Sequence, residues 1–147
     1  MLSPETPLQL GISHSAGLGM LAVSPSRVGV DLEALRSVPV EEIAGATLTA
    51  REHRALHAEP RGLARSRSFL RCWTRKEAVL KAVGTGIATD LTQLESYAWI
   101  PGPAQMTTSG PGEPTTWQVT EVPVPDGWVA SLALPLHTRG DVTVRQF

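Results

Sequence analysis

Acidic side chains in two separate motifs are the residues of this sequence most suited to chemistry. Asp31 and Glu33 stand two positions apart in G-V-D-L-E, and Glu77 stands four positions before Lys81 in W-T-R-K-E-A-V-L-K. Carboxylate oxygens suit Mg²⁺, which takes octahedral coordination from a few carboxylates, waters and substrate phosphates. Three carboxylates would hold such an ion and leave room for a phosphate, with a lysine nearby to neutralise charge.

Two secondary-structure elements must bring these motifs together. The segment V-G-V-D-L-E alternates apolar and other residues with a period of two, which predicts a strand with Asp31 and Glu33 on one face. An apolar stripe predicts a helix from about residue 66 to residue 83. On that helix Glu77 and Lys81 are about one turn apart, so a metal ligand and a cation share one surface.

Each of these signals also has an ordinary structural explanation. A Glu/Lys pair four residues apart on a helix is commonly a solvated surface pair. Two acids on one strand face are commonly just exposed to water. Trp73 lies on the apolar stripe and is more often a core residue than a ligand platform, and His14, between two serines, is more often a turn or core histidine. Taken singly, none of these signals decides the function.

The order of four short motifs resembles that of the 4'-phosphopantetheinyl transferase superfamily. The motifs are I-S-H-S at residues 12–15, G-V-D-L-E at 29–33, W-T-R-K-E-A-V-L-K at 73–81 and G-T-G at 84–86. The pairing of W-x-x-K-E-A-x-x-K with an upstream G-V-D-x-E is highly specific. The resemblance implies an α+β half-domain of this family, in which helices pack on one face of a small antiparallel sheet.

The resemblance also implies a metal site and catalytic residues. By that likeness Asp31, Glu33 and Glu77 hold Mg²⁺, or Mn²⁺ in its place, against the pyrophosphate of coenzyme A. Lys81 is expected to assist the pyrophosphate during transfer. A serine hydroxyl that attacks phosphorus also needs a proton acceptor, and Glu77, directly or through a water, is the natural candidate.

A serine–histidine pair completes the implied coenzyme site. Ser13 and His14 are expected to contact the ribose 3'-phosphate of coenzyme A. The implied reaction moves 4'-phosphopantetheine from coenzyme A to a serine of an acyl or peptidyl carrier protein and releases adenosine 3',5'-bisphosphate. A non-catalytic or repurposed module that binds coenzyme A or a carrier protein is the alternative.

The remaining pattern predicts one domain over residues 10–147, after a flexible lead-in of residues 1–9. Two short strands are expected around residues 16–19, and the Thr49–Glu52 spacing predicts a capping box at the start of a helix. Residues 101–116 are rich in proline and glycine and predict a long loop. Further segments are a short helix at 39–46, strands at 94–100, 117–122 and 128–134, and a possible fourth strand at 142–147.

Composition narrows the classes of partner and compartment. Thirteen basic residues against fourteen acidic ones give a net charge of −1, without the basic stripe that nucleic-acid surfaces need. Cys72, the single cysteine, lies in an apolar helical pattern and is expected to be a core thiol. No segment approaches the ~18–20 apolar residues of a membrane span, and no signal peptide is recognisable, so the cytoplasm is expected.

The position of I-S-H-S near the start of the chain predicts self-association. Larger members of the family that this sequence resembles contain two similar halves, and this chain resembles the second. Such a half is expected to leave one apolar sheet edge uncovered, and a monomer rarely tolerates an exposed apolar patch beyond a few hundred Å². We therefore expect a homo-oligomer in which a neighbour supplies the missing wall, or else a truncated or repurposed relative.

Overall fold

The computed structural model describes residues 7–84, 90–108, 114–138 and 142–146. In chain order the elements are β1 (Gln9–Ser15), β2 (Leu18–Ser24), β3 (Gly29–Ala34), α1 (Val40–Thr47), α2 (Ala50–His57), α3 (Leu63–Val83), the 3₁₀ helix η1 (Leu91–Gln93), β4 (Ala104–Thr108), β5 (Thr115–Glu121) and β6 (Trp128–Pro135). The fold is α+β, as expected. None of the helices in these ranges is long and apolar enough to cross a membrane.

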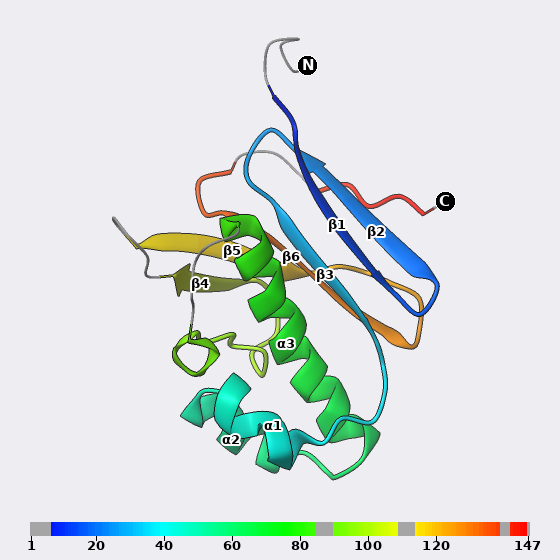
Figure 1. The fold of residues 1–147 in the computed structure, drawn as a ribbon, viewed down its shortest axis with the longest axis vertical. Coiled ribbons are helices and arrows are strands. Elements are labelled where there is room, and N and C mark those ends of the chain that lie inside the picture. Colours follow the sequence, from blue (N-terminus) through cyan, green and yellow to red (C-terminus); the bar gives the residue numbers. More distant parts are fainter. Residues whose placement is uncertain (1–6, 85–89, 109–113, 139–141, 147) are drawn as a thin grey trace.

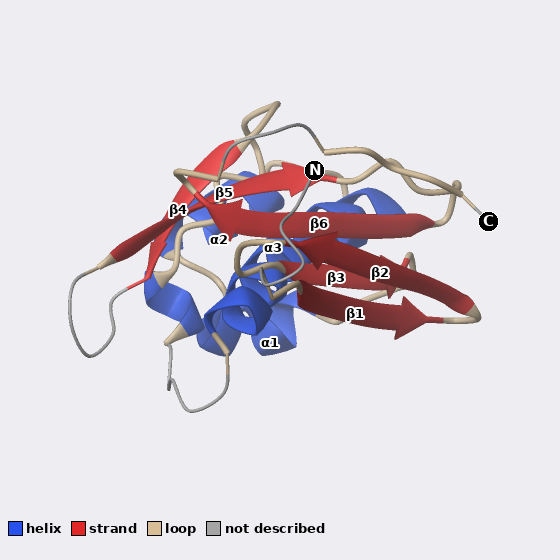
Figure 2. Ribbon diagram, turned by 90° about the horizontal axis from the view of Figure 1, so that it is seen from above, coloured by secondary structure: helices blue, strands red, loops and turns tan. Residues whose placement is uncertain are grey.

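The strands form two antiparallel sheets instead of the single sheet that was expected. Strands β1 and β2 make a hairpin, and the other four make a sheet in the order β3-β6-β5-β4. The hairpin lies beside β3, at the end of the molecule away from β4 (Figures 1 and 2). Helix α3 packs against β3 and β6, and α1 and α2 gather around its N-terminal half. Helix α3 therefore contacts both the four-stranded sheet and the two shorter helices.

Helix boundaries follow the sequence signals closely. The predicted capping box is present, with the Thr49 hydroxyl accepting from the Glu52 amide and the Glu52 carboxylate accepting from the Thr49 amide. Helix α3 begins at Leu63, earlier than expected, because Gly62 at a φ of 99° turns the chain directly into it. It ends at Gly84, whose φ of 100° stops the helix, whereas Thr85 and Gly86 lie outside the described residues.

Two strand predictions in the C-terminal half were wrong. Residues 94–100 form no strand, although residues 94–98 alternate between buried and more exposed positions. The backbone groups that would bond to a neighbouring strand are bonded to side chains instead. The Ser96 amide donates to Glu52, and the Ser96 and Tyr97 carbonyls accept from Arg75. Residues 142–146 are exposed and irregular, so the possible fourth strand is absent from the described part of that segment.

Strand β4 lies inside the segment that was predicted to be a loop. Residues 101–116 contain this five-residue strand. Its buried residues are Ala104, Met106 and Thr108, and they alternate with exposed ones. The alternation is short and flanked by proline and glycine, which concealed it in the sequence. At the N-terminus, residues 1–6 of the predicted lead-in lie outside the described residues, and β1 already begins at Gln9.

Three apolar clusters form the core. One lies among the helices, one between α3 and the four-stranded sheet, and one between the hairpin and the β3–β6 pair. Cys72 belongs to the first and is 1% exposed, which confirms the prediction of a core thiol. Burial raises the pKa of this thiol to about 12, so it stays protonated and unreactive at neutral pH.

A backbone contact at Gly29 holds β3 against α3. A Cβ atom at this position would overlap the carbonyl oxygen of Ala78 and lie 2.6 Å from the amide nitrogen of Ala82. Only glycine permits two backbones to approach this closely. The first residue of G-V-D-L-E is therefore explained by packing, and the same contact brings the acidic strand to the acidic helix.

We expect Gly29→Ala to lower the free energy of unfolding by about 3 kcal/mol, because the added methyl group must force β3 and α3 apart. Chemical denaturation monitored by circular dichroism measures this change. Gly45→Ala is the matched control, since a Cβ there meets nothing within 4 Å and alanine favours the helix. That control should raise stability by about 0.5–1 kcal/mol. Equal stabilities for Gly29→Ala and wild type would contradict the contact.

Candidate functional site

The acidic residues of the two motifs lie where β3 packs against α3. Asp31 and Glu33 come from the strand and Glu77 from the helix, and the two elements are in direct contact. Asp31 is only 4% exposed, whereas Glu33 and Glu77 are partly exposed. The charges of Glu33 and Glu77 both act on Asp31. The structure thus brings the three predicted carboxylates into one electrostatic neighbourhood.

Asp31 is the buried centre of this site. Its Oδ1 atom accepts a hydrogen bond of 2.8 Å from Lys81 Nζ, whereas its Oδ2 atom is buried without a hydrogen-bond partner. Burial raises the pKa of Asp31 to about 6, against the lowering effect of Lys81, and the nearby Glu33 and Glu77 raise it further. A cation at the Oδ2 atom of Asp31 would supply the partner that this atom lacks and would reduce the repulsion among the three carboxylates.

Glu33 is held from two sides by donors. Trp73 Nε1 donates to Glu33 Oε1 at 3.3 Å, and Arg36 donates to Oε2 at 3.0 Å. Trp73 also packs against the helical core cluster, so it is both a core residue and a partner of the site. Burial raises the pKa of Glu77, which Lys81 opposes and Glu33 reinforces. Glu33 therefore raises the pKa of both Asp31 and Glu77, because the three carboxylates repel one another.

The carboxylates are close without forming a ready set of metal ligands. Within the described ranges, no three histidine, cysteine or acidic side chains are grouped as a metal centre. In this arrangement Lys81 pairs with Asp31, and Arg36 and Trp73 donate to Glu33. The donor set still fits a hard divalent ion, since it offers carboxylate oxygens, one of them buried and unpartnered.

The serines of S-H-S attach the hairpin to the edge of β3. The hydroxyl of Ser13 accepts from the Leu32 amide and that of Ser15 from the Ala34 amide, each at 3.0 Å. These two amides flank Glu33 in the strand. Ser13 also lies 3.4 Å from Lys81 Nζ, so this predicted site residue reaches the acidic group.

His14 does not join Ser13 at the acidic group. Successive residues of a strand point to opposite faces, and Ser13 is buried whereas His14 is exposed. The imidazole therefore lies on the outer face of the hairpin, away from β3. The structure separates the two residues that the sequence pattern had predicted to act together.

Sequence reasoning missed several residues that shape the site. Ser15 and Arg36 bind the backbone and the carboxylate around Glu33, and Lys76 lies buried beside Glu77 in the sequence. The S-x-S spacing on a predicted strand was a usable signal, because both serines must share a face. Lys76 carried no such signal, since a lysine in a helix is normally exposed.

Comparison with known proteins agrees with the motif order. A model of the 4'-phosphopantetheinyl transferase superfamily matches residues 27–133. The chain is 35% identical over 132 residues to the 4'-phosphopantetheinyl transferase HetI of Nostoc sp., which covers 88% of this chain and 53% of that protein. It is 36% identical over 98 residues to the 4'-phosphopantetheinyl transferase AcpT of Salmonella typhi, covering 64% of this chain and 49% of that protein.

The matches cover most of this chain and about half of each relative. The chain spans about half the length of the curated relatives that it matches. The segment matched by the family model contains the acidic strand and the whole of α3. Since that model covers well over half of the chain, this protein belongs to the 4'-phosphopantetheinyl transferase superfamily.

Proposed function

We propose that this chain catalyses the Mg²⁺-dependent transfer of 4'-phosphopantetheine from coenzyme A to a serine of an acyl or peptidyl carrier protein in the cytoplasm. The observation that carries the proposal is the buried, unpartnered Oδ2 of Asp31, set beside Lys81 where β3 meets α3. Family membership supports the reaction type. An acidic group with one buried, unpartnered carboxylate oxygen, next to a partly exposed lysine, suits the binding of a metal-bound diphosphate.

Asp31, Glu33 and Glu77 are the residues that would hold the metal. When bound, the ion, with Mn²⁺ as a substitute for Mg²⁺, supplies positive charge to the non-bridging oxygens of the diphosphate. Lys81 is 39% exposed at its side chain, so it can leave Asp31 and pair with a phosphate oxygen of the departing group. The site would then exchange an internal ion pair for one with the substrate.

Glu77 is the proposed proton acceptor. The carrier-protein serine oxygen forms a bond to the phosphorus of phosphopantetheine as the bond from that phosphorus to the oxygen of adenosine 3',5'-bisphosphate breaks. The serine proton passes to the Glu77 carboxylate, directly or through a water. Burial raises the pKa of Glu77, which makes it a better base than an exposed glutamate.

Coenzyme binding is assigned to Ser13, His14 and Lys81. The Ser13 hydroxyl already accepts from a backbone amide, so its contribution is to orient the Lys81 ammonium 3.4 Å away. His14 is exposed on the hairpin face that also bears Leu10 and Ile12, so its proposed contact with the ribose 3'-phosphate would lie at the border of the surface that is proposed below for self-association. This division follows from their opposite orientations on β1.

A non-catalytic module that binds coenzyme A or a carrier protein is the second candidate. It is favoured by the match to only about half of each relative's length and by the carboxylates being engaged with Lys81, Arg36 and Trp73. Such a module would bind its ligand without turnover. The two candidates therefore differ in one measurable event, the modification of the carrier serine.

We expect an apo carrier protein incubated with this chain, coenzyme A and Mg²⁺ to gain the mass of one phosphopantetheine on its serine. Asp31→Ala and Glu77→Gln should each reduce turnover at least about 10²-fold, because several kcal/mol of charge stabilisation depend on these groups. Glu42→Gln, at an exposed position of α1, is the matched control and should be fully active. Absence of a mass gain with several carrier proteins would favour the binding module.

The raised pKa of Asp31 predicts a pH-dependent stability. The folded chain binds this proton more tightly than the unfolded chain, whose pKa is near 3.8. The free energy of unfolding should therefore fall as the pH rises from about 4 to about 6, by up to about 3 kcal/mol. Urea titrations in EDTA should show this fall in wild type and not in Asp31→Asn. Mg²⁺ added at pH 7 should restore it in wild type alone, and parallel pH profiles would refute the assignment.

Self-association through the outer face of the hairpin is also proposed. Leu10 pairs across the hairpin with Val23, and Ile12 with Leu21. These four side chains are 55–64% exposed and lie on one face. A continuous apolar face of this kind favours association, and a second copy of the chain offers the same uncharged surface in return.

Light scattering after size exclusion should give a mass above the 15.7 kDa of one chain at micromolar concentration. Ile12→Lys should convert the protein to a monomer, because a charge in an apolar interface is costly to desolvate. Leu63→Lys, which changes a comparably exposed leucine at the start of α3, should leave the oligomer intact. A wild-type monomer would remove the proposal.

A further inference from the structure

Outside the acidic site, the most completely satisfied polar group in the described chain is a buried ion pair. Lys76 Nζ lies 2.5 Å from Glu52 Oε1, and the two side chains are 1% and 0% exposed. Lys76 immediately precedes Glu77 in the W-x-x-K-E-A-x-x-K element, yet it points into the protein. Its burial excludes contact with a substrate diphosphate at the surface.

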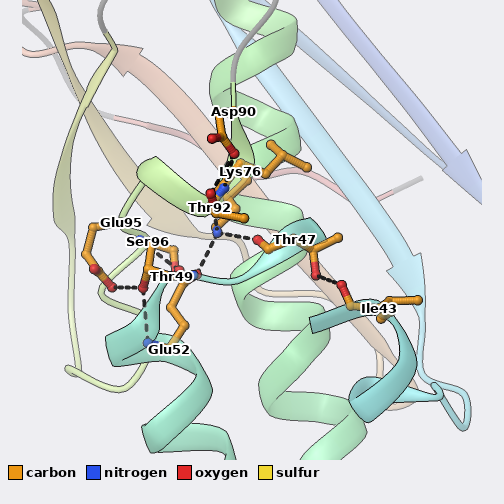
Figure 3. Close-up of polar contacts among 10 residues, drawn as sticks. Ile43, Thr47, Thr49, Glu52, Lys76, Asp90, Thr92, Glu95 and Ser96 are labelled. Carbon is orange, nitrogen blue, oxygen red and sulfur yellow. Dashed lines mark hydrogen bonds and ion pairs between the residues drawn. The ribbon is translucent and has the colours of Figure 1, made fainter. Parts of the chain in front are cut away.

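Every donor of the Lys76 ammonium is used inside the fold. Besides Glu52, it donates to the carbonyl of Thr47 at 2.6 Å and to that of Leu91 at 2.8 Å. Thr47 ends α1, Glu52 lies in the first turn of α2, and Leu91 begins η1. One side chain of α3 thereby joins three other elements, and Figure 3 shows Lys76 with Thr47 of α1 and Glu52 of α2. An ammonium group has three donors, so none remains for a ligand.

Glu52 is saturated in the same way. Its Oε1 atom accepts from the Thr49 amide at 2.8 Å as well as from Lys76, and its Oε2 atom accepts from the amide of Ser96 at 3.0 Å and from the Ser96 hydroxyl (Figure 3). Four donors match the acceptor capacity of one carboxylate. The network is therefore closed and leaves no polar atom of either side chain to bind anything else.

The network fixes the orientation of α3 from the side opposite to the sheet contact. Lys76 and Glu77 are about 100° apart around the helix, so a rotation that frees one moves the other. Gly29 holds the same helix against β3. We propose that Lys76 is a positioning residue. Held by Glu52 and Ser96, it fixes the direction in which the Glu77 side chain leaves the helix, and it takes no part in the chemistry. This inference rests on the proposed transfer reaction.

The test compares Lys76→Met with Arg67→Met, an exposed residue of the same helix. Lys76→Met should lower the Tm by at least about 5 °C, reduce kcat about tenfold when assayed well below the Tm, and increase amide hydrogen exchange over residues 76–81. Arg67→Met should change none of these. A Lys76→Met protein that keeps the wild-type Tm and exchange but loses turnover would overturn the proposal, because the lysine would then act in the reaction.

Ser96→Ala provides a milder variant that retains the ion pair in case Lys76→Met does not fold. It removes one hydroxyl donor from Glu52, far along the chain from both motifs. We expect kcat to fall several-fold with the KM for coenzyme A unchanged, together with faster exchange at residues 76–81. A lowered Tm with unchanged kcat and exchange would show that the network merely stabilises the fold. If wild type shows no transfer, the proposed function fails, whereas the exchange measurement still decides the positioning role.

Discussion

The backbone contact between β3 and α3 at Gly29 is the constraint on which the site depends. It brings a strand and a helix closer than any side chain at that position would allow. Asp31 and Glu33 consequently share one electrostatic environment with Glu77, which lies more than forty residues later in the sequence, and the charges of Glu33 and Glu77 both raise the pKa of Asp31. Any chemistry that these acids perform therefore depends on the close packing of Gly29 against α3.

The site manages its own negative charge with side chains of the same domain. Lys81 pairs with Asp31, and Arg36 and Trp73 donate to Glu33. These partners differ in burial, since the Lys81 and Arg36 side chains are partly exposed whereas Asp31 is enclosed. The cations are therefore the components able to move when a ligand arrives, and the buried acid stays in place. Preorganisation here lies in the strand, and adaptability lies in the lysine and the arginine.

Local patterns predicted the elements that local forces determine. The strand around Asp31 and Glu33, the capping box at Thr49 and the ending of α3 before Gly84 were confirmed, although Gly29 to Leu32 are all buried and the burial of the strand does not alternate. Segment 94–100 failed because its alternating burial is real while its backbone groups bind the side chains of Glu52 and Arg75. Such competition arises from tertiary contacts, which no period in the sequence reports.

The sequence indicated which acidic side chains lie near one another, and not how they are hydrogen-bonded. Motif order singled out the three acids and Lys81, and the S-x-S spacing indicated that Ser13 and Ser15 share a face, whereas nothing in the spacing indicated which amides the two serines would bind. The attachment has a mechanical consequence. The hairpin is held against β3 by two serine hydroxyls, by an apolar cluster and by the Trp128 indole, which donates to the Ser15 carbonyl, so its position depends on side chains and not on a continuous backbone ladder.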